Sequence, residues 1–178
     1  MDSPIFADLQ GFVVGERFVA KEVAVLINGA ELTHHIFRAP MAWNLLTNTE
    51  KTRACWLTAN HHQFKWNDGH VDYGSAKRLI RDAIYRGTSP DFVTRIYVKG
   101  HEKKKWLLEI LGNIAEDRDV IVETIDADYE DIGRLETLDA SRALRCAYHA
   151  KNCALENVCK LRDWWMERRD DLNNILNI

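Results

Sequence analysis

Three side chains that can bind a metal ion lie close together near the end of the sequence. They are Cys146, His149 and Cys153, with the spacing Cys-x2-His-x3-Cys. Thiolate and imidazole are ligands that zinc prefers, and a closed tetrahedral zinc site needs four ligands. On a straight helix Cys146 and Cys153 would be about 10 Å apart, which is too far to share one ion. If they are ligands, Cys146 must lie in a loop and Cys153 at the start of the next helix.

The spacing alone leaves three interpretations open: a metal site, a simple buried core, and some other use of the thiols. Free cysteine is among the most buried residue types, which favours the core. Cys159 lies well off the face of the other two at about 100° per residue and is expected to be plain core. Glu22, inside an apolar segment, also needs a partner, because an unpaired buried carboxylate is unfavourable.

Composition sets the broad class of protein. The chain has 178 residues, 46% of them hydrophobic and 29% charged, and we expect one domain over residues 1–178. It contains no apolar run of about 18 residues, so no membrane span is predicted. The N-terminus lacks the apolar stretch of a signal peptide, so we expect an intracellular protein with free or metal-bound cysteines. The net charge of −3 means that any nucleic-acid binding must use a local patch.

The pattern of apolar residues predicts an α/β protein. Three strands joined by tight turns should form an antiparallel meander, and two later strands should run parallel to the first strand through right-handed connections. We expect strands over 5–14, 17–29, 31–40, 92–100 and 119–127. We expect helices over 43–47, 75–87, 102–113, 128–138 and 153–177, the last one broken near 169–171, with a loop from 48 to 73.

This order resembles the ribonuclease H-like fold, a mixed sheet flanked by helices. The motifs are similar to those of a degenerate DEDDh (DnaQ-type) 3′–5′ exonuclease domain over residues 4–168. The family's Asp-x-Glu strand, its second strand, its "HGI", its "GHNAxFD" and its "HxAxxDA" are matched in order by Asp8-Leu9-Gln10, Lys21-Glu22-Val23-Ala24-Val25, His62-Gln63-Phe64, Gly100-His101-Glu102 and His149 with Cys153-Ala154.

The departures from that family bear on catalysis. Two-metal hydrolysis needs several carboxylates around two divalent ions and a histidine base. Gln10 is neutral, Cys153 replaces the last aspartate, and neither residue at 105–106 is acidic. Of the five catalytic positions only Asp8 and His149 remain, as vestigial residues. The resemblance therefore implies a pseudonuclease, and Asp8→Ala is expected to fold normally.

A sub-branch of this fold, the Maelstrom domain, loses the acids in a similar way. The Maelstrom domain has a Glu-Cys-His-Cys zinc set, and the resemblance implies that its ligands correspond here to Glu22, Cys146, His149 and Cys153. A closed site of four ligands is structural. It would tie the last helix to the second strand and stabilise the fold.

The resemblance implies two functions of different classes. The first is a zinc-stabilised, non-catalytic module that binds single-stranded RNA or a silencing-pathway protein, in small-RNA silencing, a mobile element or a virus. The alternative is an active metal-dependent ribonuclease or 3′–5′ exonuclease with a rearranged site. In it Asp8, Glu123 or Asp126 would supply carboxylates for Mg²⁺ or Mn²⁺. The oligomeric state is left open.

Three further groups of residues are candidates for binding. Lys103, Lys104 and Lys105 follow a strand and begin a helix, so they could hold phosphate or form a solvated turn. Trp106 beside them could stack on a base or belong to the core. The histidine-rich segment 60–70 could bind metal, but a polar loop is favoured; its candidates are His61, His62, Asp68 and His70. Of Trp164 and Trp165, one should pack inward and the other could mark a partner contact.

Overall fold

The computed structural model describes residues 4–113, 119–139 and 144–176. Its strands are β1 (Ile5–Val14), β2 (Arg17–Ile27), β3 (Glu31–Ile36), β4 (Thr94–Val98) and β5 (Val120–Thr124). Its helices are α1 (Asn48–Asn60), α2 (Ala76–Arg86), α3 (His101–Leu111), α5 (Ile125–Asp128) and α6 (Ala154–Leu176). Three short 3-10 helices are η1 (Trp43–Leu45), η2 (Tyr73–Ser75) and η3 (Leu135–Thr137).

The five strands form one mixed sheet in the order β3-β2-β1-β4-β5, with β1 in the centre. β1 and β2 pair antiparallel, as do β2 and β3. β4 pairs parallel with β1, and β5 pairs parallel with β4. The predicted meander with two added parallel strands is therefore confirmed, and Asp8 lies on the central strand.

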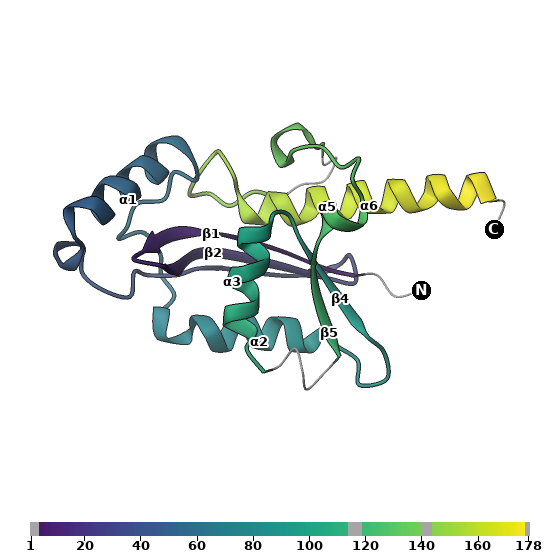
Figure 1. Ribbon diagram of the computed structural model, residues 1–178, viewed down its shortest axis with the longest axis horizontal. Coiled ribbons are helices and arrows are strands. Elements are labelled where there is room, and N and C mark those ends of the chain that lie inside the picture. Colours follow the sequence, from purple (N-terminus) through teal and green to yellow (C-terminus); the bar gives the residue numbers. More distant parts are fainter. Residues whose placement is uncertain (1–3, 114–118, 140–143, 177–178) are drawn as a thin grey trace.

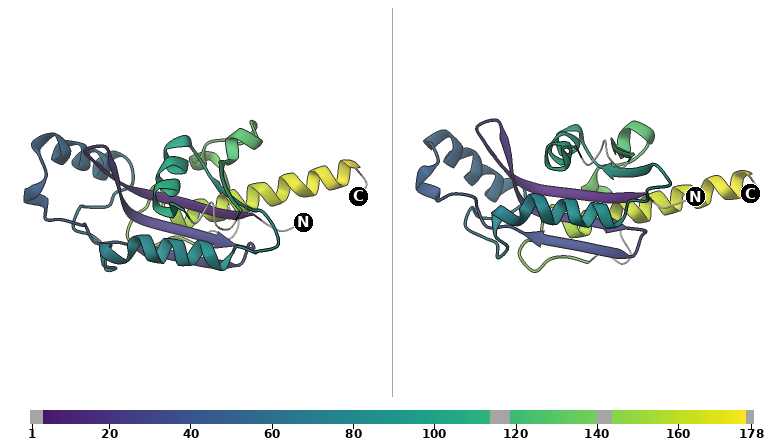
Figure 2. Two further views of the ribbon diagram at one scale, coloured as in Figure 1. Left: turned by 60° about the horizontal axis from the view of Figure 1, so that its bottom comes forward. Right: turned by 90° about the horizontal axis from the view of Figure 1, so that it is seen from below.

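Helices cover both faces of this sheet, and alternate residues of β1 point to opposite faces. Ile5, Ala7 and Leu9 pack in one core cluster with residues of α2 and α3. Phe6 packs in a second cluster with residues of α6. Figure 1 shows α2 and α6 on opposite sides of the long strands β1 and β2, and Figure 2 shows the same layers from two other directions. The face of α6 is therefore the one that receives Asp8, Gln10 and Glu22.

A β-bulge interrupts the pairing of β1 with β2 between Gln10 and Gly11. A Cβ atom at Gly11 would lie 2.1 Å from the carbonyl oxygen of Val19, so only glycine fits there. Bulges bend a strand and re-aim its side chains, and they are frequent beside functional sites. This bulge directly follows Gln10, at the place where β1 reaches the cleft described below.

The largest error in the predicted elements is α1, which occupies residues 48–60 where a loop was expected. Ala54 is the only residue of α1 that is fully buried, so the helix shows no clear apolar period. Its start carries a local signal that the prediction overlooked. Thr47 and Glu50 form a capping box, each side chain accepting from the other residue's backbone N–H.

Other differences are shorter. The helix predicted over 128–138 is wrong, because only its first residue, the end of α5, and η3 are helical there. α5 begins inside the predicted last strand. The break predicted in the last helix is also wrong: α6 is continuous from Ala154 to Leu176, and residue 177 lies outside the described residues. No helix in the described part of the chain has both the length and the apolar character of a membrane span.

Candidate metal centre and adjoining cleft

Four residues from distant parts of the chain form a candidate metal centre: Glu22, Cys146, His149 and Cys153. Their ligand atoms all lie within 4.8 Å of one another. Glu22 and Cys153 are fully buried, His149 is 8% exposed, and Cys146 is half-buried. β2 positions Glu22, while Cys146 lies in the loop before α6 and Cys153 directly precedes that helix. The loop-and-helix placement predicted from the spacing is confirmed.

The loop that carries His149 is fixed by the segment after α1. The side chain of Gln63 accepts hydrogen bonds from the backbone N–H groups of Ala150 (2.8 Å) and Lys151 (3.2 Å). Asn152 donates to the carbonyl oxygen of His61 at 2.9 Å. Asn152 adopts φ = 49°, in the left-handed region that asparagine tolerates better than most residues. These contacts hold the turn that brings His149 and Cys153 together.

The carboxylate of Glu22 has partners on both oxygens. Oε1 lies 2.8 Å from His34 Nε2 and 3.7 Å from Cys153 Sγ. Oε2 accepts the backbone N–H of Ala154 at 2.9 Å, the first residue of α6. Sequence reasoning missed His34. Its signal was available, because period-2 alternation on β3 puts His34 on the face that also carries Glu22.

The ring of His149 is oriented for ligation. Its Nδ1 lies 2.7 Å from the carbonyl oxygen of Lys151, which accepts an N–H and fixes the tautomer. Its Nε2 is buried and lies 3.1 Å from Glu22 Oε2, but it lacks the geometry of a hydrogen bond. The second nitrogen therefore points at the acid without a satisfied partner, as expected for an atom that binds a cation.

Without an ion, the cluster has strongly shifted pKa values. Burial alone would raise the pKa of Glu22, but His149, His34 and the N–H of Ala154 hold it at about 2. Burial alone would lower the pKa of His149, but contacts with Cys153 and Glu22 raise it to about 10. Burial raises the pKa of Cys146 to about 12. A metal ion must therefore displace protons from His149 and from Cys146 when it binds.

The donor set fits one ion. Ligands on a single zinc ion are about 3.3–3.8 Å apart, so the widest pair here must close by about 1 Å. Among the described residues, this is the only group of three or more His, Cys, Asp and Glu side chains close enough to hold an ion. The structure thus shows a Glu-Cys-His-Cys group that could hold a metal ion.

Asp8, on the central strand, has a different environment. It is fully buried, and its Oδ2 accepts from Asn157 of α6 (2.8 Å) and from Gln10 (3.1 Å). Its Oδ1 forms an ion pair with Lys103 of α3. This ammonium–carboxylate pair was not predicted. Its signal was weak, because the two residues are 95 positions apart.

The three lysines of the predicted phosphate-binding group, residues 103–105, have different environments in the structure. Lys103 pairs with Asp8, Lys104 pairs with Glu123 at 2.7 Å, and Lys105 is exposed. The pair with Lys104 also lowers the pKa of Glu123. Asp126 Oδ2 forms an ion pair with Lys99 Nζ at 3.4 Å. Asp8, Glu123 and Asp126 do not form one of the metal-holding groups found in the described residues.

The histidine-rich segment contributes contacts within the protein. His62 is fully buried, with Nε2 3.0 Å from the carbonyl oxygen of Gly11, and its Nδ1 accepts the N–H of Phe64 at 3.1 Å. Lys21, also buried, donates to the carbonyl oxygens of Trp66 and Asp68 and so holds this segment against β2. No described residue of this segment belongs to the metal group.

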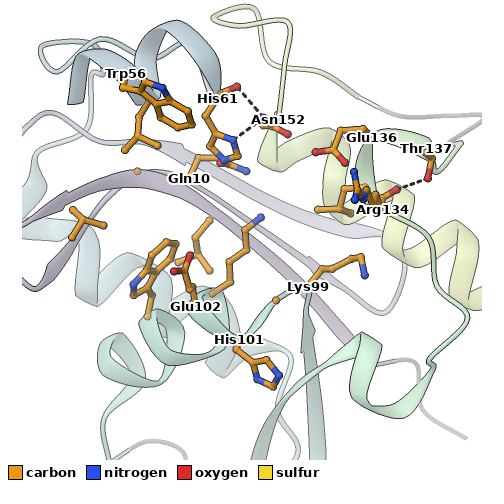
Figure 3. A pocket seen from close by; sticks show the side chains of 18 residues that line it. Gln10, Trp56, His61, Lys99, His101, Glu102, Arg134, Glu136, Thr137 and Asn152 are labelled. Atoms are coloured by element: carbon orange, nitrogen blue, oxygen red, sulfur yellow. Dashed lines mark hydrogen bonds between the residues drawn. The ribbon is translucent and has the colours of Figure 1, made fainter. Parts of the chain in front are cut away.

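A cleft of about 910 Å³ opens beside Gln10, and Lys103, the partner of Asp8, lines it. β1 contributes its floor, α1 one wall, and the turn after β4 with the start of α3 the opposite wall. Figure 3 shows Trp56 and His61 on one side, Glu102 on the other, Gln10 between them, and Arg134 and Glu136 at one end. The charged side chains that line the cleft are Lys99, Lys103, Arg134, Glu102 and Glu136.

Aromatic residues flank this cleft. Trp56 is 61% exposed, and sequence reasoning missed it because it lies on the unpredicted α1. Trp106 also lines the cleft, but its ring stacks on Phe18 with centroids 3.8 Å apart. Trp165 packs inward at 7% exposure, and Trp164 is half-buried against Tyr129. Cys159 is core, as predicted, at 3% exposure.

Fold and site define an α/β protein with a mixed sheet and a candidate metal centre at the junction of β2 and α6. No family model, no curated protein and no solved structure matches the chain. The assignment of a function therefore depends on the chemistry of the chain's own residues.

Proposed function

We propose that this protein is a zinc-stabilised, non-catalytic module of ribonuclease H-like fold that binds single-stranded RNA. The observation that carries the proposal is the position of the cleft. β1 connects to β2 on one side of the sheet and β4 connects to β5 on the other, so β1 and β4 flank a topological switch point. In open α/β sheets, ligands bind outside the carboxyl ends of the strands at such a point.

The character of the cleft supports a single strand as the ligand. The exposed indole of Trp56 offers a stacking surface that only an unpaired base can use. Lys99, Lys103 and Arg134 line the cleft, where cationic side chains can contact the phosphates of a strand. RNA is the nucleic acid that the Maelstrom resemblance implies.

The residues around Asp8 support a non-catalytic role. Two-metal hydrolysis needs several carboxylates that share two ions. Asp8 instead has two amides and one ammonium as neighbours. The other acids considered, Glu123 and Asp126, are each paired with a lysine. No specific contact in the described residues favours the nuclease alternative.

The donor chemistry supports zinc as the ion. Two thiols, an imidazole and a carboxylate suit zinc, whereas magnesium and calcium prefer oxygen ligands alone. Glu22, Cys146, His149 and Cys153 would hold the ion, and their four donors leave no open position for water. Such an ion would crosslink β2 to the start of α6 and would activate no nucleophile.

Binding to a fluorescent oligouridylate of about 12 nucleotides tests the function. We expect salt-dependent binding to the single strand, weaker binding to a duplex of the same length, and no cleavage with Mg²⁺ or Mn²⁺. Trp56→Ala should weaken binding about tenfold, because stacking contributes about 1–3 kcal/mol per base. Phe92→Ala is the matched control, since Phe92 is similarly exposed (65%) but does not line the cleft.

Two results would contradict the proposal. Equal losses in Trp56→Ala and Phe92→Ala would show that the cleft is not the binding site. A folded wild-type protein that binds no single strand would exclude RNA and leave a protein partner as the remaining expectation. A DNA strand of the same sequence, measured in parallel, shows whether the 2′-hydroxyl matters.

A further inference from the structure

Lys103 has an unusual position, because it joins the buried centre of the sheet to the open cleft. Its ammonium pairs with Oδ1 of Asp8, which is fully buried, while the lysine side chain is 16% exposed. Lys103 also lines the cleft. An ammonium has three N–H donors, and the hydrogen bond described for this nitrogen uses one of them. The other two donors are left for a ligand that enters the cleft.

Asp8 requires a cation at this position. A buried carboxylate without a compensating charge is strongly unfavourable, and the amides of Gln10 and Asn157 supply hydrogen bonds but no charge. In a metal-dependent site, a divalent ion would both neutralise the acid and contact a phosphate of the ligand. Here a covalently attached ammonium lies on the acid, at the same boundary between protein and cleft.

We propose that Lys103 acts as a built-in cation that bridges Asp8 to a phosphate of the bound strand, so that RNA binding needs no divalent ion. This inference rests on the proposed function and deepens it. It separates Lys103 from Lys104, whose ammonium is paired with Glu123 and does not line the cleft. The bridge sets the position of one phosphate beside Gln10, while Trp56 on the other wall receives a base.

The bridge makes the ion requirement of binding the decisive measurement. Affinity for the fluorescent oligouridylate is measured in buffer passed over a chelating resin, and again with millimolar Mg²⁺. Wild-type protein should bind in both buffers, and Mg²⁺ should not tighten binding. Lys103→Ala should bind about tenfold more weakly without Mg²⁺, the loss of one charge-assisted hydrogen bond. Added Mg²⁺ should restore most of that affinity, because Asp8 and the phosphate can then share a hydrated ion.

A second variant keeps the test valid if Lys103→Ala does not fold. Asp8→Asn with Lys103→Met removes both charges, so no buried charge is left unpaired. This double variant should bind about tenfold more weakly with or without Mg²⁺. The slope of log K against log salt should fall by about 0.7, the value for one phosphate contact on a single strand. Lys77→Met is the control, because Lys77 is exposed on α2 and does not line the cleft.

The outcomes separate the two proposals. If the folded wild type binds no RNA, the proposed function fails and the bridge fails with it. If the wild type binds and the double variant keeps the same affinity and salt slope, the bridge alone is overturned. A wild type whose binding requires Mg²⁺ would also overturn the bridge, since the ammonium would not then replace the ion.

Discussion

Glu22 and Asp8 are two buried carboxylates on the same face of the sheet, and they are partnered in opposite ways. Both are fully buried, and both accept a hydrogen bond from α6, through the backbone of Ala154 and the side chain of Asn157 respectively. Glu22 faces two thiols and the imidazoles of His149 and His34, and Asp8 faces an ammonium. The acid with soft neighbours can share an external ion, whereas the acid paired with Lys103 already has its cation.

The difference teaches how a buried acid indicates its role. Burial alone does not distinguish a ligand from a structural ion pair, because either partner removes the penalty of the unpaired charge. The neighbouring donors do distinguish them. The four predictions below test this contrast, from the largest expected effect to the smallest.

Removal of the metal should lower the free energy of unfolding more than any other change, and it should act on the Glu22 cluster alone. Zinc present at about a thousandfold above its Kd contributes about 4 kcal/mol to the free energy of unfolding. We expect a chelator, or Cys153→Ser, to remove that stabilisation in urea denaturation. Metal analysis should give one zinc per chain for the wild type and none for Cys153→Ser. Cys55→Ser is the control, since Cys55 is exposed and outside the cluster.

The stabilisation by the Asp8–Lys103 ion pair should not change when a chelator is added, but it should be lost when either residue is replaced. Lys103→Ala leaves a buried carboxylate uncompensated and should lower the free energy of unfolding by about 3 kcal/mol. Asp8→Ala should also destabilise, contrary to the expectation from sequence, because it leaves the Lys103 ammonium without its acid. The double variant Asp8→Asn/Lys103→Met should recover most of the loss. Additive losses in a double-mutant cycle would show that the two charges do not interact.

Low pH should destabilise the fold through protonation of His62, which lies in the segment after α1 and contacts Gly11 of β1. Burial, opposed by the hydrogen bond to Gly11, holds its pKa at about 4 instead of 6.5, and His61 and His149 lower it while Glu22 raises it. Because the folded-state pKa is the lower one, His62 stabilises the fold above pH 6.5. That contribution is lost as the pH falls from 6.5 to 4, by up to about 1.4 kcal/mol per pH unit.

The measurement for His62 is urea denaturation at several pH values between 4 and 7. His62→Gln cannot gain a proton in this range, so its stability should fall less steeply with acid than that of the wild type. The loss of metal at low pH is common to both proteins and cancels in the comparison. If the free energy of unfolding fell equally steeply with acid in both proteins, His62 would not be the source of the pH dependence of stability.

Lys105 should give the smallest effect. It is exposed, has no place in either cluster, and does not line the cleft. Lys105→Ala should change the free energy of unfolding by less than about 0.5 kcal/mol. From sequence, loss of all three lysines 103–105 is expected to lower the salt slope of RNA binding by about 2. The proposed bridge instead attributes the main part to Lys103, and a larger slope change in Lys105→Ala than in the double variant would reverse that order.

Much of the fold follows from local patterns. The strands of the meander are apolar segments separated by short turns, and Asn28 and Gly29 in one turn both have positive φ. α1 was missed because its stability comes from a cap and a single buried alanine rather than an apolar stripe. The capping box at Thr47 and Glu50 was the readable signal for this helix.

The metal cluster could be predicted because its three loop residues are close in sequence. Cys146 and Cys153 would be too far apart on one straight helix to share an ion, so their spacing predicts a loop followed by a helix start. Glu22 is predicted only through the resemblance. The Asp8–Lys103 pair and the cleft could not be predicted, because each joins segments whose proximity depends on the sheet order. A buried acid without a local cation was the signal that a distant lysine was needed.

The link between Glu22 and Cys153 has a consequence for biosynthesis. The two residues are 131 positions apart, so a ribosome working at about 5–20 residues per second needs roughly 7 to 26 seconds between them. During that interval the Glu22 carboxylate has His34 of β3 as a partner, but Cys146, His149 and Cys153 have not yet been made. If the four residues bind a metal ion, its capture must therefore be among the last events of synthesis. A chain released before residue 153 would pair Glu22 with His34 but would lack the complete ligand set.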